Sequence, residues 1–199
     1  MRITAGYARS ILLDAPRGDA TRPATDAARL AVFSSLGDIP ENADVLDIFA
    51  GTGAYGLEAA SRGAKSAVFV EKSPAAFAFL KRNIARVQKL VPAKLSAALA
   101  DCFKCKHALS DSAFDLIFAD PPYALLSNAD FQKSLFELFG RVARENAYII
   151  LEAPAEFEPD APEGFKLAKR LGKKSKGKPS QLIFLYVGKG RQSAFFTYS

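Results

Sequence analysis

The chain has 199 residues, of which 49% are hydrophobic and 24% are charged, as is ordinary for one soluble globular domain. No apolar run approaches the roughly 18 residues of a membrane span, and the first residues lack the apolar core of a signal peptide, so we expect a cytoplasmic protein. The net charge of +6 and the pI of about 9.3 favour a polyanionic partner, with a merely solvated basic face as the equal alternative.

The first twenty residues are interpreted as a small extended appendage, a hairpin at residues 1–20, and residues 21–199 as one domain. Thr25 and Asp26 are suited to cap a helix that runs through residues 33–36. All positive charge in the first thirty residues is arginine, whose planar fork suits phosphate: Arg2, Arg9, Arg17, Arg22 and Arg29.

An apolar run at residues 45–49 predicts a buried strand, and a glycine-rich turn follows it. The segment reads Asp47-Ile48-Phe49-Ala50-Gly51-Thr52-Gly53-Ala54-Tyr55-Gly56, with glycines that fit G-x-G-x-x-G. Glycine allows a tight turn and lets the backbone approach a ligand closely. A second strand, at residues 67–70, ends at Glu71, where a carboxylate can accept both hydroxyl groups of a ribose.

Asp47 separates two explanations of these glycines. NAD-dependent dehydrogenases share the glycine pattern and the acid that ends the second strand. They rarely carry a charge inside the first strand, four residues before the first glycine, where Asp47 stands. We therefore disfavour a dehydrogenase.

The middle of the chain continues the alternation of helices and strands. Apolar residues at helical spacing predict helices at residues 74–90 and 129–143, and a weaker strand is expected at residues 94–99. Asp101 follows that strand. The aromatic residues of the two predicted helices are assigned to the core.

The most specific feature is Asp120-Pro121-Pro122-Tyr123, which follows a predicted strand at residues 115–119. Ligands bind at the carboxyl ends of strands in open parallel sheets. The tetrapeptide resembles the D-P-P-Y motif of amino-methyltransferases that act on adenine, cytosine or guanine. The resemblance implies that an exocyclic amine donates hydrogen bonds to Asp120 and to a proline carbonyl, which would draw its nitrogen toward tetrahedral geometry. Tyr123 offers a flat face on which an extruded base can stack.

The C-terminal part departs from the alternation. A strand at residues 148–151 is followed by an expected antiparallel hairpin of residues 165–171 and 181–187. Residues 166–178, which cover most of the first arm and the turn after it, hold seven Lys or Arg and no acid. Together the elements predict an α/β fold with a mostly parallel seven-stranded sheet, helices on both faces and a closing hairpin.

The acids, the glycine turn and D-P-P-Y together resemble class I, Rossmann-like methyltransferases that modify amino groups of nucleic-acid bases. The resemblance implies S-adenosylmethionine as the cofactor and a catalytic set of Asp120, Pro121, Pro122 and Tyr123. In such enzymes the first-strand acid anchors the methionine end, and an acid after the third strand receives the adenine amino group. The implied cofactor site consists of Asp47, Phe49, Ala50, Gly51, Thr52, Gly53, Gly56, Glu71, Lys72, Asp101 and Cys102.

The N-terminal signature narrows the match. Residues 21–26, then Arg29 and Phe33, resemble the R-P-T-x-D-x-x-R-x-x-x-F signature of the family that methylates the guanine N2 amine in bacterial small-subunit (16S) ribosomal RNA. The resemblance implies action on ribosomal RNA or on the assembling small subunit, and we expect a monomer. With the basic turn, the expected RNA contacts are Arg9, Arg22, Thr25, Asp26, Arg29, Lys173, Lys174, Lys176 and Lys178.

Two other functions stay open at this point. One is an amino-methyltransferase for DNA adenine or cytosine, or for a small molecule, although 199 residues leave no room for a separate target-recognition domain. The other is a non-catalytic RNA-binding assembly factor, against which the intact Asp120 and Tyr123 argue.

No metal is expected. Cys102, Cys105 and His107 lie close together in sequence, but a structural zinc normally needs four ligands, and no second group of such residues exists. Two cysteines are also too few for a disulfide framework.

Overall fold

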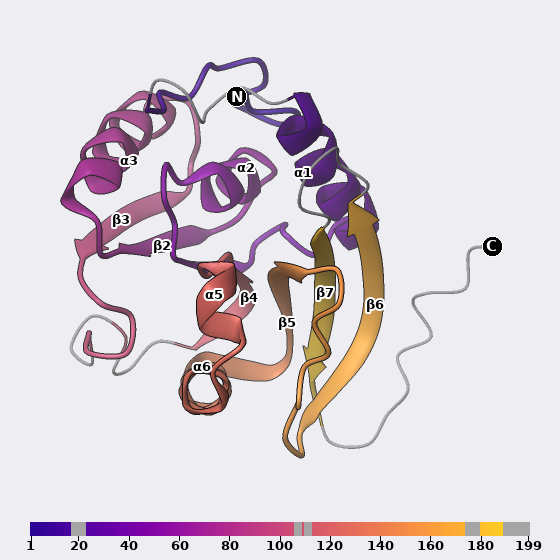
Figure 1. The fold of residues 1–199 in the computed structure, drawn as a ribbon. Coiled ribbons are helices and arrows are strands. Elements are labelled where there is room, and N and C mark those ends of the chain that lie inside the picture. Colours follow the sequence, from indigo (N-terminus) through magenta and orange to yellow (C-terminus); the bar gives the residue numbers. More distant parts are fainter. Residues whose placement is uncertain (17–22, 106–108, 110–112, 174–179, 189–199) are drawn as a thin grey trace.

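The computed structural model describes residues 1–16, 23–105, 109, 113–173 and 180–188. A seven-stranded sheet in the order β3-β2-β1-β4-β5-β7-β6 forms its centre (Figure 1). Neighbouring strands from β3 to β5 are parallel, and β7 runs antiparallel to both β5 and β6. The strands are β1 (Asp44–Ile48), β2 (Ser66–Glu71), β3 (Lys94–Leu99), β4 (Phe114–Ala119), β5 (Ala143–Pro154), β6 (Phe165–Lys173) and β7 (Ser180–Val187).

Helices cover both faces of this sheet, because successive strand residues point to opposite sides. Phe69 and Phe118 belong to one buried cluster, and their neighbours Val70 and Ile117 belong to the other. The first face packs against α1 (Pro23–Leu36), α2 (Ala54–Ser61) and α3 (Pro74–Val87). The second packs against α5 (Tyr123–Leu126) and α6 (Ala129–Val142). The predicted fold class, a Rossmann-like sheet with a closing hairpin, is confirmed.

Side-chain caps begin two of these helices. Ser73 Oγ accepts a hydrogen bond from the N–H of Ala76 at 3.4 Å, directly before α3. Asn128 Oδ1 accepts one from the N–H of Phe131 at 3.0 Å, directly before α6. In contrast, α1 begins at Pro23, so the predicted cap at Thr25 and Asp26 is wrong. Proline at the start of a helix loses no hydrogen bond and has a helical φ already.

The described N-terminal residues fold back on themselves. Arg2 and Leu12 form an antiparallel bridge, and the N–H of Ile3 donates to the carbonyl of Ile11 at 3.0 Å. Ile3, Ala8 and Leu13 are buried in the cluster beneath α1 to α3. The division between residues 1–20 and 21–199 stays a prediction, since residues 17–22 lie outside the described part.

The predicted element boundaries differ little from the observed ones, except at β5. This strand starts at Ala143, immediately after α6, where a strand from residue 148 was expected. Asn146 has a φ of 71°, and the register with β4 shifts there, so the pattern of the first residues is irregular. Within the described residues, no helix has the length and apolar character needed to cross a membrane.

Candidate active site

The site lies where the direction of the fold reverses. From β1 the chain continues to β2 and β3 on one side, and from β4 it continues to β5 on the other. Ile48 and Ala119 are paired residues of β1 and β4, so Phe49 and Asp120 leave the sheet side by side. Open α/β sheets bind ligands at such a switch point, beyond the carboxyl ends of the strands.

The loop after β1 is a tight turn of left-handed residues. Phe49, Gly51 and Gly53 have φ values of 58°, 55° and 84°. A Cβ atom on Gly53 would lie 2.5 Å from Cδ1 of the buried Leu80, so glycine is needed there for both conformation and space. Because Phe49 is not glycine, its positive φ stores strain at the loop.

Asp47 holds this loop from below. Its Oδ2 accepts a hydrogen bond from the N–H of Gly56 at 2.9 Å, and only 3% of the residue is exposed. Burial raises the pKa of Asp47 to about 8, since the Gly56 N–H offsets it only partly and the charges of Asp120 and Glu71 raise it further.

Glu71 supports the loop from the end of β2. Its Oε2 accepts from the N–H of Gly51 at 2.8 Å, and its Oε1 accepts from the N–H of Ser73 at 2.6 Å. A carboxylate has about four acceptor positions, which leaves capacity for ribose hydroxyls. Sequence reasoning missed a second support, the buried Asn83, whose Nδ2 donates to the Thr52 carbonyl at 3.0 Å.

A small apolar hollow of about 30 Å³ lies beyond the ends of β2 and β3. Asp101 Oδ1 accepts from the N–H of Phe103 at 2.9 Å, which fixes the turn after β3. The expected cofactor residues Phe49, Lys72, Asp101 and Cys102 line this hollow. Leu125 and Phe131, which line it too, were not predicted. The aromatic faces and the one acid match the chemistry of an adenine ring, but the hollow is smaller than the ring, so its side chains would have to move apart to admit it.

A second pocket, of about 240 Å³, joins the glycine loop to D-P-P-Y. Asp120 is exposed into it, Pro121 is buried, and Tyr123 begins α5 half-buried. The pocket is lined by Met1, Arg29, Asp47, Phe49, Ala50, Gly51, Thr52, Ala54, Tyr55, Asp120 and Glu152. The two hollows share Phe49, so a cofactor that bridges them would lie across the glycine loop and reach Asp120.

Comparison with known proteins agrees with this arrangement. The family model described as conserved hypothetical protein 95 matches residues 1–184. The chain belongs to this family.

The chain is 31% identical over 164 residues to the ribosomal RNA small subunit methyltransferase D of Escherichia coli K12, covering 82% of this chain and 77% of that protein. It is 30% identical over 164 residues to YlbH of Bacillus subtilis, provisionally named an rRNA methyltransferase, covering 79% of this chain and 85% of YlbH. The solved structure of the Escherichia coli protein yhhF superposes with a TM-score of 0.75 at 26% identity, over 96% of this chain and 99% of that one. This member of the family is therefore a methyltransferase with the class I fold, and the predicted resemblance is confirmed.

Arg29 has an anchoring role in this family member that the sequence did not indicate. Only 2% exposed, it donates to Glu58 at 3.4 Å, to Asp26 at 2.9 Å and to the carbonyl of Arg2. It also lines the pocket of Asp120. RNA contact by Arg29 and Asp26 stays a prediction.

The other expected RNA contacts are only partly placed. Arg9 is exposed on the N-terminal hairpin, and Lys173 ends β6. Arg22, Lys174, Lys176 and Lys178 lie outside the described residues, as does the side chain of Thr25.

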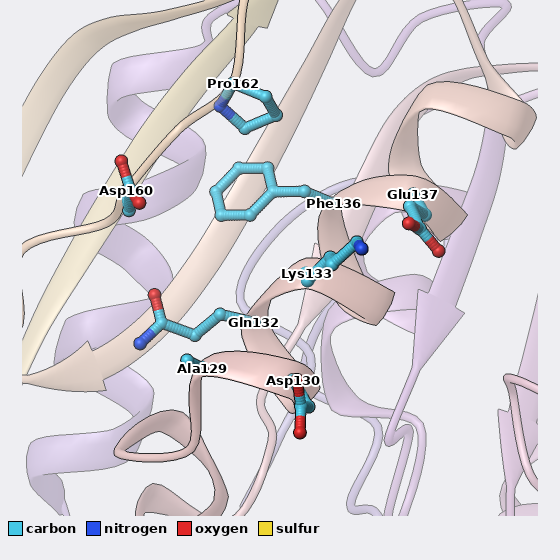
Figure 2. A pocket seen from close by; sticks show the side chains of 8 residues that line it. All are labelled: Ala129, Asp130, Gln132, Lys133, Phe136, Glu137, Asp160 and Pro162. Carbon is cyan, nitrogen blue, oxygen red and sulfur yellow. The ribbon is translucent and has the colours of Figure 1, made fainter.

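Two further features carry none of this chemistry. A hollow of about 590 Å³ lies between α6 and the segment before β6, and it shares no residue with the glycine loop or D-P-P-Y. In Figure 2, Phe136 faces Pro162 across it, and acidic and basic side chains lie around it. Cys102 is buried, which raises the pKa of its thiol to about 12 and leaves it unreactive. Within the described residues, no group of three or more His, Cys, Asp or Glu is arranged to hold a metal ion, and His107 lies outside them.

Proposed function

We propose that this protein transfers the methyl group of S-adenosylmethionine to the N2 amine of a guanine in small-subunit ribosomal RNA. The observation that carries the proposal is the single pocket formed by the glycine loop of β1 and Asp120 of β4. The RNA substrate is inferred from relatives that are named for small-subunit ribosomal RNA. A monomer, and a choice between free RNA and the assembling particle, stay predictions.

The cofactor, when bound, supplies a methyl group on a sulfonium that leaves as a neutral thioether. In this proposal Glu71 would accept the ribose hydroxyls, Asp101 would accept the adenine amine, and the glycine loop would contact the part between adenine and the methyl group. The contact of Glu71 with the loop and the pocket positions of Asp101 and the loop support these roles. The glycine loop needs no further closure for this role, since Asp47, Glu71 and Asn83 already hold it. Such alignment is a large share of catalysis in a displacement reaction.

Asp120 then acts on the nucleophile. The guanine amine is a weak nucleophile because its lone pair is delocalised into the ring. An N–H donated to Asp120, and another to the Pro121 carbonyl, would favour a tetrahedral nitrogen. When the C–N bond forms, one N2 proton leaves to Asp120 or to water, so the product amine is neutral.

Tyr123 supplies the face for the base. Its hydroxyl lies 3.3 Å from Glu152 Oε1, which fixes the orientation of the ring at the pocket. Burial raises the pKa of Tyr123 to about 12, so its hydroxyl stays neutral throughout the physiological range. A neutral ring stacks on an extruded base without repelling the phosphates.

The proposal is tested with radiolabelled S-adenosylmethionine and three unmethylated substrates: small-subunit ribosomal RNA, its protein-bound particle and duplex DNA. Nucleosides from any labelled product are identified by mass. N2-methylguanosine in the RNA or the particle is the expected result. Methylated adenine or cytosine in DNA would replace the proposal with a DNA enzyme, and cofactor binding without transfer would indicate a non-catalytic assembly factor.

Replacing Asp120 separates chemistry from binding. We expect Asp120→Ala to lower kcat by at least about 100-fold, the usual size of a proton-transfer contribution, with an unchanged Kd for S-adenosylmethionine. The matched control is Asp115→Ala at the opposite end of β4, where the carboxylate pairs with the exposed Arg144 at 2.6 Å. Equal loss of turnover in both variants would remove Asp120 from the mechanism.

A further inference from the structure

Glu152 is a carboxylate in the active-site pocket to which the sequence analysis gave no role. It lies in β5, is 9% exposed, and lines the same pocket as Asp120. A buried carboxylate loses the solvation of water and persists only where hydrogen bonds replace it.

Hydroxyl groups from three different elements hold Glu152 in place. The hydroxyl of Tyr55 in α2 donates to Oε2 at 3.3 Å, and that of Tyr123 in α5 donates to Oε1 at 3.3 Å. Ser180 Oγ of β7, itself buried, donates to Oε1 at 3.5 Å. Burial and the charge of Glu152 raise the pKa of both tyrosines, so their hydroxyls remain donors.

The groups that donate to Glu152 are themselves held in fixed orientations. The ring of Tyr55 stacks on Phe118 at 5.1 Å, so the donor to Oε2 is itself fixed. The carboxylate is oriented from three sides, and it lines the same pocket as Asp120. A base held against Tyr123 in this pocket would therefore meet both carboxylates.

The chemistry of the three amino-bearing bases decides what such an acceptor recognises. Guanine presents N1–H beside its N2 amine, so two donors stand next to each other. Adenine and cytosine present a ring-nitrogen acceptor beside the amine, and a lone pair facing a carboxylate is repelled. A site with two carboxylates, one for the amine and one for its neighbour, therefore favours guanine and rejects the others.

We propose that Glu152 accepts the N1–H of the target guanine while Asp120 accepts an N2–H, and that Glu152 thereby determines which base this pocket methylates. The inference rests on the proposed function and adds the residue that reads the base.

The test compares guanosine with 2-aminopurine at the methylated nucleotide. 2-Aminopurine keeps the C2 amine, has an acceptor at N1 in place of the N1–H, and lacks O6. Because the loss of O6 is the same for every variant, the change in base preference caused by Glu152→Gln reports the group that Glu152 reads. Synthetic RNA with either base, at the position found in the labelling experiment, is ligated into the full small-subunit RNA. Values of kcat/KM are measured for the wild type, Glu152→Gln and Ser180→Ala.

The wild type should prefer guanosine by at least about 100-fold, as sites built for a substrate donor do. Glu152→Gln should narrow this ratio at least about 10-fold, because an amide can donate to N1 and accept from the C2 amine. Ser180→Ala removes one support of Glu152 but keeps the carboxylate, so it should narrow the ratio much less than Glu152→Gln does. The Kd for S-adenosylmethionine and the midpoint of unfolding show that each variant is folded.

Failure of the inference is distinct from failure of the function. If Glu152→Gln slows both bases equally, Glu152 only positions Tyr123, and the inference is overturned while guanine methylation stands. If the wild type forms no N2-methylguanosine, the proposed function itself is wrong.

Discussion

Asp47 and Glu71 both hold the glycine loop, but their surroundings give them different chemistry. Asp47 is enclosed and receives the N–H of Gly56, whereas Glu71 stands at the rim of the sheet and receives two N–H groups. One hydrogen bond does not offset the loss of solvation at Asp47, which keeps its proton to about pH 8. A carboxyl group inside a strand is thus stabilised as a neutral donor and acceptor.

This protonation predicts a pH dependence of stability. Between the usual pKa of 3.8 and the folded value of about 8, the folded protein holds a proton that the unfolded chain has released. Stability from this group is therefore full below pH 3.8 and is lost as pH rises through 8. Relative to Asp47→Asn, the wild type should lose about 1.4 kcal/mol more free energy of unfolding per pH unit between pH 5.5 and 7.5.

Urea unfolding at several pH values in that window measures this difference. Asp14→Asn is the matched control, because Arg86 and Arg82 lower the pKa of Asp14 and its effect lies below the window. Parallel profiles for the wild type and Asp47→Asn would mean that Asp47 is ionised in the folded protein.

The N-terminal hairpin is an element whose attachment shapes the active site. Gly6 has a φ of 79° and lies against the end of α2, where the N–H of Tyr7 donates to the carbonyl of Ser61 at 2.8 Å. Glu58 of α2, fully buried, accepts from the N–H of Thr4 at 2.8 Å and pairs with Arg29. Met1 and Arg29 line the catalytic pocket, so the hairpin is part of its wall.

Gly6→Ala should detach this hairpin. A Cβ atom there would lie 1.7 Å from the carbonyl oxygen of Ser61, which is backbone and cannot turn aside. Gly37→Ala is the control, with a φ of 55° and no atom within 4 Å of the added Cβ. Both variants lose about 1–2 kcal/mol for the left-handed conformation, and Gly6→Ala should lose about 1–3 kcal/mol more for the overlap.

Thermal unfolding compares these stabilities, and limited proteolysis reports whether the hairpin is released. Methylation should fall in Gly6→Ala because the pocket loses a wall, and stay near wild type in Gly37→Ala. Equal stability of the two variants would show that the hairpin adapts to the added methyl group.

The sequence predicts the helices and strands more completely than it predicts the residues of the site. The central strands β1, β2 and β4 were predictable because burial on both faces makes them continuous apolar runs. The edge strand β3 has no buried residue and gave a weaker signal, although its predicted bounds, Lys94 to Leu99, are the observed ones. Glu58 was not predictable as an anchor, since its partners Thr4 and Arg29 are distant in sequence. Glu152 had a signal that was overlooked: like Glu71 and Asp120, it is an acid at the end of an apolar strand.

At the scale of the whole molecule, strand direction sets where β6 ends and β7 begins. Lys173 pairs with Ser180, and Ser180 pairs with Pro154, two residues after Glu152. Because β6 runs in the same direction as β5, the backbone of Lys173 lies at the carboxyl edge of the sheet, where D-P-P-Y also lies. The basic residues that follow Lys173 in the sequence lie outside the described part, and their contact with RNA stays a prediction.

Replacing Lys173, Lys174, Lys176 and Lys178 with glutamine should weaken RNA binding and flatten its salt dependence. Each lost phosphate contact lowers the slope of log K against log salt by about 0.7–0.9, so four contacts correspond to a change of about 3. The turnover number at saturating RNA should persist, because Asp120 and Glu152 are unchanged. Filter binding across a salt series measures the slope.

The control removes the same charge from elsewhere. It replaces four exposed lysines that lie in or just after α3 or at the amino ends of β2 and β3, namely Lys65, Lys81, Lys89 and Lys94. If the charge of the turn acts through its position, only the first variant changes the slope strongly. If both variants lose the same affinity and the same slope, RNA binding follows net charge alone, and the basic turn is a solvated loop. The position of Lys173 at the same edge of the sheet as Pro154, with Ser180 between them, leads us to expect the first result.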